Sequence, residues 1–591
     1  MRDWTDAACV DLSKPWFSEE AGWPDEVPKA IEMPLMTLGE MLHESARRNP
    51  DNRAIWFLDT FISYRQLDDM VDRMATGLHG IGLRKGDVVA LLLPNSTQYV
   101  VSYFACARLG CIVTGVNPTH KPAEVLHQLC LTGAGTLIVL DNLYDPLVAP
   151  IIAKTGIERV IHTNIADLTD LSPFKRFFGK LLGKIPTGRV PSSSHSFVRL
   201  LRSLPTPPDV ALDVHDPAVY MMTGGTTGVP KAAVMSHFNC VGNAWQCRKW
   251  LYKFDSLSVD IGVLPLFHAF AMTTIMNTSL ITGAWMMLFP RPPKTDELIA
   301  RIEALGPEGR TMYPGAEILF KRLAEMPGIE KSKIAKKFSL CVSGAGPLHR
   351  PIQEAFEART GARLVEGYGL TEAGPVVSAG PFWGRRKIGT IGLPLPGTDW
   401  KIMDAEAFGQ EKEPCPEGQA PDLARHIGEL VVSGPQVMIG YLNDPDETAN
   451  HIRQYQGKDW LLTGDIGYMD LQGRVVLMDR KKELIKVEGH SVFPKEVEEL
   501  VGAHPAVLDA VVAGIPDRET GERVKTWLVL RPEYKGKITN VELIAWWRNN
   551  MAYYKVPFYV DFIDELPKNL IGKVQRRQLQ ENDPIYRAYH S

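Results

Sequence analysis

The fold is decided by residues 87–141, which read DVVALLLPNSTQYVVSYFACARLGCIVTGVNPTHKPAEVLHQLCLTGAGTLIVLD. Three short apolar runs have the character of buried strands, namely DVVALLLP, CIVTGVNP and GTLIVLD. The patterns between them are helical, TQYVVSYFACARLG and KPAEVLHQLC. Strands that alternate with helices form parallel βαβ units, so we expect an α/β fold with covered sheets.

The same alternation continues along most of the chain. It resumes near Ala218 and extends beyond residue 400, where the polar, proline-rich segment 411–424 precedes GELVVSG and a short β-rich stretch. Residues 172–208 break the pattern with Pro, Ser and basic residues and contain no acid. We interpret residues 172–208 as an insertion.

A second, smaller domain is predicted at the C-terminal end. After MDRKKELIKVEG the pattern changes to helix PKEVEELVGAH, strands AVLDAVVAGI and KTWLVLR, and helix NVELIAWWRNN. These elements form an α+β unit. We therefore expect a large domain over residues 1–481 and a small mobile domain over residues 482–591, with a hinge at Lys482.

Composition excludes several classes of protein. A chain of 591 residues is too long for one core, and a formal charge of -4 gives no reason to expect nucleic acid as a partner. The eight cysteines form no C-x-x-C pair or Cys/His cluster, and the N-terminus has no apolar core. We expect a cytoplasmic protein. The long uncharged stretch 261–290 is diluted by Thr, Asn, Ser, Gly and Pro, which favours a buried helix over a membrane span.

The glycine-rich segment TGGTTGVPK, residues 223–231, has the composition of a phosphate-binding loop. Its glycines let backbone amides converge on phosphate oxygens, its threonines add hydroxyl donors, and Lys231 adds positive charge. It is not a Walker A loop, because Val229 and Pro230 separate the lysine from the last glycine. Taken alone, the segment is equally compatible with a turn that binds nothing.

Five further motifs follow in order: SGAGPL (343–348), EGYGLTEAG (366–374), TGDIGYMD (463–470), DRKKELIKVEG (479–489) and PKNLIGKVQR (567–576). With TGGTTGVPK they resemble the adenylate-forming superfamily of acyl-CoA synthetases, nonribosomal-peptide adenylation domains and firefly-type luciferases. The resemblance spans nearly the whole chain. It implies that a carboxylate attacks the α-phosphate of ATP to give acyl-AMP and pyrophosphate.

The resemblance also implies a role for each motif. Thr223 and Glu372 are expected to hold Mg²⁺, Tyr368 to lie against adenine, and Asp465 and Arg480 to bind the ribose. Ala232 departs from the glycine that usually follows the loop lysine. The residues assigned to ATP are Thr223, Gly224, Gly225, Thr226, Thr227, Gly228, Lys231, Gly344, Ala345, Gly346, Glu366, Gly367, Tyr368, Gly369, Thr371, Asp465, Arg480 and Lys573.

The predicted acid is apolar. Relatives that adenylate α-amino acids generally place an aspartate near the start of the region matching PLFHAF, but residues 264–287 contain no acid. A buried ammonium without a carboxylate is costly, so a medium or long fatty acid, or an aryl acid, fits better. His268 matches a position that lines the acyl site, although a buried histidine bonded to backbone is also compatible. Five apolar residues either line an alkyl tunnel or pack in the core: Met272, Met276, Trp285, Met286 and Met287.

The acceptor of the acyl group is predicted to be CoA. By resemblance, Lys573 acts in adenylate formation, Lys486 acts in the second half-reaction, and Gly489 leaves room for the pantetheine arm. We therefore expect an ATP-dependent, Mg²⁺-dependent acyl-CoA synthetase. Transfer to an acyl carrier protein, an aryl-acid CoA ligase and a non-catalytic homologue remain alternatives.

The insertion has two interpretations. PFKRFFGKLLGKIPTGRV and FVRLLRSL interleave Phe and Leu with Lys and Arg at helical spacing. Such a surface suits weak peripheral contact with an anionic membrane, and a solvated loop is the alternative. The sequence leaves the oligomeric state open, including a homo-oligomer.

Overall fold

The computed structural model describes residues 10–223, 230–305, 310–332, 338–568 and 574–590. The chain divides into two compact units, unit 1 with Met1–Asp399 and Val432–Leu461, and unit 2 with Trp400–Val431 and Leu462–Ser591. Lys482 lies inside unit 2, in a short 3-10 turn over Lys481–Glu483. Its role as a hinge stays a prediction, as do the predicted domain limits.

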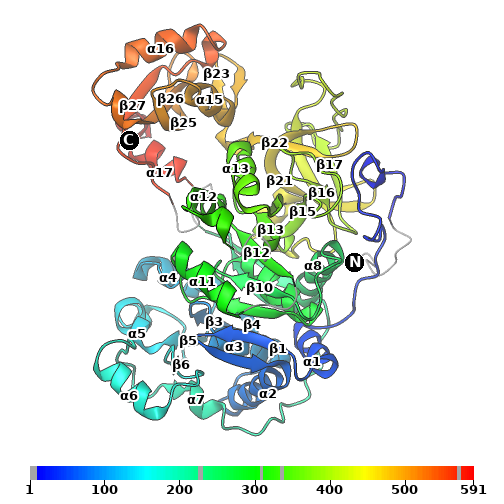
Figure 1. Ribbon diagram of the computed structural model, residues 1–591, viewed down its shortest axis with the longest axis vertical. Helices are drawn as coiled ribbons and strands as arrows, with labels where there is room; N and C mark the ends of the chain where they lie inside the picture. Colours follow the sequence, from blue (N-terminus) through cyan, green and yellow to red (C-terminus); the bar gives the residue numbers. More distant parts are fainter. Residues whose placement is uncertain (1–9, 224–229, 306–309, 333–337, 569–573, 591) are drawn as a thin grey trace. The chain divides into compact units, whose positions relative to one another are not determined.

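Unit 1 contains the α/β fold that the sequence predicts. Residues 87–141 form β3 (Val88–Leu92), α3 (Thr97–Leu109), β4 (Ile112–Gly115), α4 (Pro122–Thr132) and β5 (Thr136–Leu140), and β3 pairs in parallel with both β4 and β5 (blue and cyan in Figure 1). The strands β3, β4 and β5 belong to an eight-stranded sheet, which also contains the hairpin of β8 and β9. Its order is β19 (Gly440–Tyr441), β9 (Ala232–Ser236), β8 (Pro217–Met222), β4 (Ile112–Gly115), β3 (Val88–Leu92), β5 (Thr136–Leu140), β6 (Arg159–Thr163) and β7 (His195–Ser196).

A nine-stranded sheet forms the other half of unit 1. Strands β10 to β14 are parallel to one another, so their carboxyl ends meet at one edge, whereas β15 pairs with β14 in the antiparallel sense. The order is β16 (Leu393–Pro394), β15 (Val376–Ala379), β14 (Leu364–Gly369), β13 (Phe338–Ser343), β12 (Thr311–Gly315), β10 (Val259–Gly262), β11 (Trp285–Leu288), β1 (Arg53–Phe57) and β2 (Thr60–Ser63).

Local sequence signals fix the ends of the helices. Ser63 and Gln66 form a capping box at the start of α2, and Ser96 caps α3, which ends at Gly110 in the left-handed conformation. The longer helices of unit 1 are α1 (Leu38–Arg48), α2 (Tyr64–Gly80), α3 (Thr97–Leu109), α4 (Pro122–Thr132), α8 (His237–Trp250), α11 (Thr295–Leu305), α12 (Glu317–Glu325) and α13 (Arg350–Thr360).

The uncharged stretch 261–290 is not one buried helix. The chain leaves β10 at Gly262, is helical from Ala269 to Thr282 through α9 (Ala269–Ala271), a π-helical turn and α10 (Thr278–Thr282), and then forms β11. Nearly all of these residues are buried, including Met272, Met276 and the four apolar residues of β11. The strands and the helices of this stretch are both buried, which explains why neither carries charged residues. Composition alone therefore cannot distinguish a buried strand from a buried helix. No helix in the described ranges has the length and hydropathy needed to cross a membrane.

The predicted insertion is shorter than residues 172–208. Its first part forms α6 (Pro173–Leu181), but His195–Ser196 form β7, the edge strand of the eight-stranded sheet. The following α7 (Phe197–Leu200) buries Phe197 and Leu200 against the body of unit 1. Phe197 and Leu200 of FVRLLRSL are therefore core residues and do not belong to the predicted surface, whereas Leu204 is exposed. The membrane contact predicted for this insertion stays a prediction.

Unit 2 contains the predicted α+β elements. Its sheet has the order β24 (His490–Val492), β23 (Ile485–Val487), β26 (Gly521–Leu530) and β25 (Val507–Asp517), and β27 (Tyr559–Phe562) pairs with β26. Trp547 and Val497 lie in its core. Its helices are α15 (Pro494–Gly502), α16 (Asn540–Arg548), α17 (Arg576–Asn582) and α18 (Pro584–His590).

Three strands span the boundaries between the units in sequence. They are β17 (Asp399–Met403), β18 (Gly428–Ser433) and β21 (Lys458–Met469). The remaining elements of this region are α14 (Pro445–His451), β20 (Ile452–Tyr455) and β22 (Val475–Arg480).

Candidate functional site

The glycine-rich segment connects the two strands of a hairpin. β8 ends at Met222, which pairs with Ala232 at the start of β9, and the backbone N–H of Thr223 donates to the carbonyl of Lys231 at 2.8 Å. The hairpin thus fixes Thr223 and Lys231 opposite each other at the base of the loop. Gly224, Gly225, Thr226, Thr227 and Gly228 lie outside the described residues. The helix that follows β9 is α8, and Ser236 caps its start.

Lys231 faces two carboxylates that the sequence analysis did not consider. Its Nζ lies 2.6 Å from Oε1 of Glu447 on α14 and 3.7 Å from Oδ2 of Asp444. The hydrogen bond from Lys231 lowers the pKa of the Glu447 carboxyl. Both side chains of the Lys231–Glu447 pair are partly exposed, so solvent weakens their attraction.

Glu372 is held next to the same group of residues by Tyr441. The Tyr441 hydroxyl donates to Oε1 of Glu372 at 2.9 Å, and Lys231 Nζ lies 5.6 Å from the centroid of the Tyr441 ring. Burial, followed by the nearby Glu372 charge, raises the pKa of Tyr441 well above the ordinary phenol value. Tyr441 is therefore a neutral donor that links Glu372 to the hairpin carrying Thr223 and Lys231.

Two contacts from buried side chains position the segment that contains Glu372. Asn243 on α8 donates through Nδ2 to the carbonyl of Val376 at 2.8 Å and accepts from its N–H at 2.9 Å. The Thr273 hydroxyl donates to the carbonyl of Gly374 at 2.7 Å. Buried polar groups that lose their partners cost about 1–3 kcal/mol, so these bonds restrain the loop strongly.

The predicted adenine site lies at the carboxyl ends of two neighbouring parallel strands. Ser343 pairs with Glu366, so the segment Gly344–Gly346 after β13 lies beside Gly367, Tyr368 and Gly369 in β14. Tyr368 is half-buried. Ala345 has a φ of 64°, a conformation unusual for a residue with a side chain.

Phe270, two residues after His268, packs against Gly344 at the end of β13. A Cβ atom on Gly344 would lie 2.8 Å from Cζ of Phe270, so only glycine allows this contact. Nδ1 of the half-buried His268 accepts from the N–H of Phe270 at 3.3 Å. Asn95 fixes the preceding loop, because its amide donates to the carbonyls of Gly262 and Leu264 and accepts from the N–H of Leu266.

Unit 2 carries the predicted ribose-binding pair. Asp465 in β21 pairs with Arg480 in β22, and Arg480 Nε lies 2.6 Å from Oδ1 of the buried Asp465. The two side chains that the resemblance assigns to one sugar are therefore in contact. The carboxylate of Asp465 has a second oxygen that can accept hydrogen bonds from hydroxyl groups.

Lys486 and Gly489 belong to the β-hairpin formed by β23 and β24. Lys486 Nζ donates to the Ser491 hydroxyl at 2.8 Å. Glu488 and Gly489 connect the strands with φ values of 50° and 80°, as the two central residues of a type I′ turn require. The positive φ at position 489 favours glycine there, independently of the predicted passage of CoA. Lys573 lies outside the described residues.

Four residues near the site were not predicted from the sequence: Tyr441, Glu447, Asn243 and Asn95. Tyr441 and Glu447 belong to GYLNDPDET, residues 440–448, whose conspicuous Asp and Glu residues follow a strand and were the available signal. Asn243 and Asn95 gave no local signal, because an amide in an apolar segment does not reveal its distant partners.

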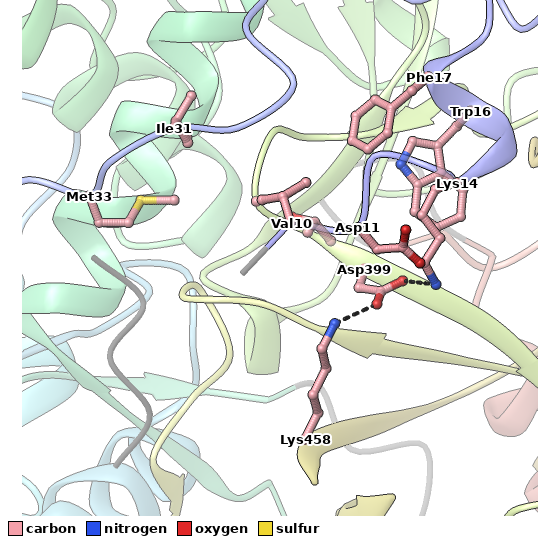
Figure 2. A pocket seen from close by; sticks show the side chains of 11 residues that line it. Val10, Asp11, Lys14, Trp16, Phe17, Ile31, Met33, Asp399 and Lys458 are labelled. Atoms are coloured by element: carbon pink, nitrogen blue, oxygen red, sulfur yellow. Dashed lines mark hydrogen bonds and ion pairs between the residues drawn. The ribbon is translucent and has the colours of Figure 1, made fainter. Parts of the chain in front are cut away.

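A small hollow lies elsewhere in unit 1. Lys14 Nζ lies 3.1 Å from Oδ1 of Asp399, and Lys458 Nζ lies 2.7 Å from Oδ2 of the same residue (Figure 2). Trp16 and Phe17 line the same hollow. Its volume is about 40 Å³, which suits a few water molecules and not an acyl chain. None of the predicted site residues lines the hollow.

Comparisons with known proteins agree with these observations. The sequence matches the family described as AMP-binding enzyme over residues 42–442, and AMP-binding enzyme C-terminal domain over residues 496–573. It is 35% identical over 587 residues to a long-chain-fatty-acid–CoA ligase of Bacillus subtilis (strain 168), covering 97% of this chain and 99% of the relative. A ligase of the same description from Yersinia pestis is 34% identical over 585 residues, with 97% and 98% covered.

A solved structure extends the similarity to the fold. ATP-bound MatB from Rhodopseudomonas palustris superposes with a TM-score of 0.78 at 26% identity, covering 93% of this chain and all of that one.

Proposed function

This chain belongs to the AMP-binding enzyme family, and we propose that it joins a long-chain fatty acid to CoA at the expense of ATP. The observation that carries the proposal is that Tyr441 contacts both Lys231, through its ring, and Glu372, through its hydroxyl. That cluster offers a cation for phosphate oxygens and a carboxylate for a metal ion within one part of unit 1. The full-length similarity to fatty-acid–CoA ligases supports the choice of acid.

The proposed reaction has two steps. A carboxylate oxygen of the acid attacks the α-phosphorus of ATP, and pyrophosphate leaves. The CoA thiol then attacks the acyl carbonyl, and AMP leaves with the oxygen that came from the acid. In the first step Lys231 would bind phosphate oxygens, and Asp465 and Arg480 would hold the ribose.

The residues present fit Mg²⁺. No group of three or more His, Cys, Asp or Glu side chains in the described ranges could form a metal site by itself. Proteins commonly bind Mg²⁺ with one or two carboxylates together with substrate phosphates. Tyr441 orients Glu372 through Oε1, and the Thr223 hydroxyl, which donates to the Lys231 carbonyl at 3.4 Å, keeps lone pairs for a metal. When bound, the ion would make the α-phosphorus more electrophilic.

The apolar surroundings of His268 support a fatty acid. Residues 264–287 carry no acid, and most of them are buried. A substrate ammonium there would have no carboxylate partner in that segment, at a cost of several kcal/mol. We also propose peripheral contact with a membrane through residues 172–208.

A substrate screen tests the proposed function. We expect fatty acids to support AMP release and thioester formation with CoA, and every α-amino acid to support neither. Activity should rise with chain length into the long-chain range, because each added methylene buries apolar surface worth about 0.8 kcal/mol. Transfer to an acyl carrier protein but not to CoA, or exchange driven only by amino acids, would contradict the proposal.

A further inference from the structure

Helix α6 carries an apolar face that is largely exposed. Phe174 is 71% exposed, Phe177 63% and Leu181 68%, and Leu182 and Phe178 extend the same face. These positions recur at intervals of three and four residues, so they line one side of the helix. The rings of Phe174 and Phe178 pack on each other with centroids 4.5 Å apart. We call this set of five residues the α6 face.

Basic residues accompany the α6 face. Residues 172–208 contain no acid, and Lys175, Lys184 and Arg189 are exposed next to or shortly after the helix. Arg176 does not contribute, since it donates to the carbonyl of Thr169 at 3.2 Å. The surface thus combines exposed aromatic and aliphatic groups with an excess of positive charge.

The segment is attached to unit 1 from its other side. Asn164 donates through Nδ2 to the carbonyl of Pro186 at 2.8 Å, and Nδ1 of His162 lies 2.9 Å from the hydroxyl oxygen of Ser194. Ser172 caps the start of the helix. These contacts attach the chain that follows α6 to unit 1, and the five apolar side chains of the α6 face stay exposed.

We propose that the α6 face docks on an anionic lipid bilayer and lies in its interface. Phe and Leu side chains enter the acyl boundary while Lys and Arg meet anionic headgroups, the pattern of interfacial helices. A second copy of the chain is a poorer occupant, because a symmetric contact would bring the same basic residues together. A protein partner would need an acidic surface opposite these basic residues, and anionic lipid headgroups provide that negative charge. The inference goes beyond the ligase reaction and does not depend on it.

Vesicle cosedimentation of the full chain tests this assignment. The triple variant Phe174→Ser, Phe177→Ser, Leu181→Ser should bind vesicles of phosphatidylcholine and phosphatidylglycerol at least about ten-fold more weakly than wild type. Charge reversal by Lys175→Glu with Lys184→Glu should also weaken binding, and so should high salt. Val541→Ser is the matched control, since Val541 on α16 is exposed to the same 71% as Phe174.

Each outcome is decisive. Loss of binding in the triple variant, with wild-type binding in Val541→Ser and unchanged ligase activity toward a water-soluble acid, supports the proposal. Wild-type binding by the triple variant overturns it. Equal binding of wild type to pure phosphatidylcholine vesicles overturns the role of charge. A dimer in sedimentation velocity that the triple variant abolishes, without vesicle binding by wild type, assigns the face to a second copy and also overturns it.

Discussion

Replacing Glu372 with Gln is expected to slow adenylate formation by about 10³-fold or more, because the charge that holds the proposed Mg²⁺ is lost. A metal ion contributes several kcal/mol of charge stabilisation in such a transition state, and about 1.4 kcal/mol corresponds to a factor of ten. The Gln carbonyl can still accept the hydrogen bond from Tyr441, so the melting temperature should remain unchanged. ATP–pyrophosphate exchange measured against Mg²⁺ concentration gives the rate.

Tyr441→Phe is the matched control for this experiment. It removes the hydroxyl that donates to Glu372 at 2.9 Å but leaves the carboxylate charge in place. We expect a much smaller loss of rate, since only the orientation of Glu372 is affected. A near-normal rate for Glu372→Gln at saturating Mg²⁺ would mean that the carboxylate has a structural role only.

Lys573→Ala is expected to abolish adenylate formation and yet to convert supplied acyl-AMP and CoA to the thioester. The proposed reason is that this lysine places a point charge between the attacking carboxylate and the α-phosphate, a contact needed only in the first half-reaction. Lys568→Ala is a control from the same segment, because Lys568 pairs with Asp509 at 3.1 Å on an exposed surface. Single-turnover assays measure the two half-reactions separately.

The complementary variant is Lys482→Pro. Proline fixes φ, so a hinge at this position should lose its freedom, and the variant should form adenylate but transfer the acyl group poorly. Equal loss of both half-reactions in Lys573→Ala and Lys482→Pro would refute the alternation of the small domain.

The α/β fold followed from the sequence because each strand and helix of residues 87–141 has its own local pattern. Local patterns gave the wrong secondary structure or burial where the tertiary surroundings of a segment determine them. The stretch 261–290 is apolar because it is buried, and burial is shared by β10, α10 and β11. Likewise Phe197 and Leu200 look like α6 residues in sequence, but the edge strand β7 brings them into the core.

Residues of the candidate site could be predicted from the sequence only where they belong to a recognisable motif. Thr223, Lys231 and Glu372 stand in recognisable segments, whereas the partner that links them, Tyr441, lies 69 residues beyond Glu372. Asn243 contacts Val376 across 133 residues of sequence. Such contacts depend on the tertiary fold, and neither periodicity nor spacing encodes them.

The transfer of oxygen from the acid to AMP tests the central claim most directly. The enzyme is supplied with ATP, CoA and a long-chain fatty acid whose carboxyl oxygens are both ¹⁸O, and the products are analysed by mass spectrometry. If the carboxylate attacks the α-phosphorus, AMP gains one ¹⁸O atom for each acyl-CoA formed and pyrophosphate gains none. Unlabelled AMP, or label in pyrophosphate or inorganic phosphate, would contradict an acyl-adenylate intermediate and with it the proposed function.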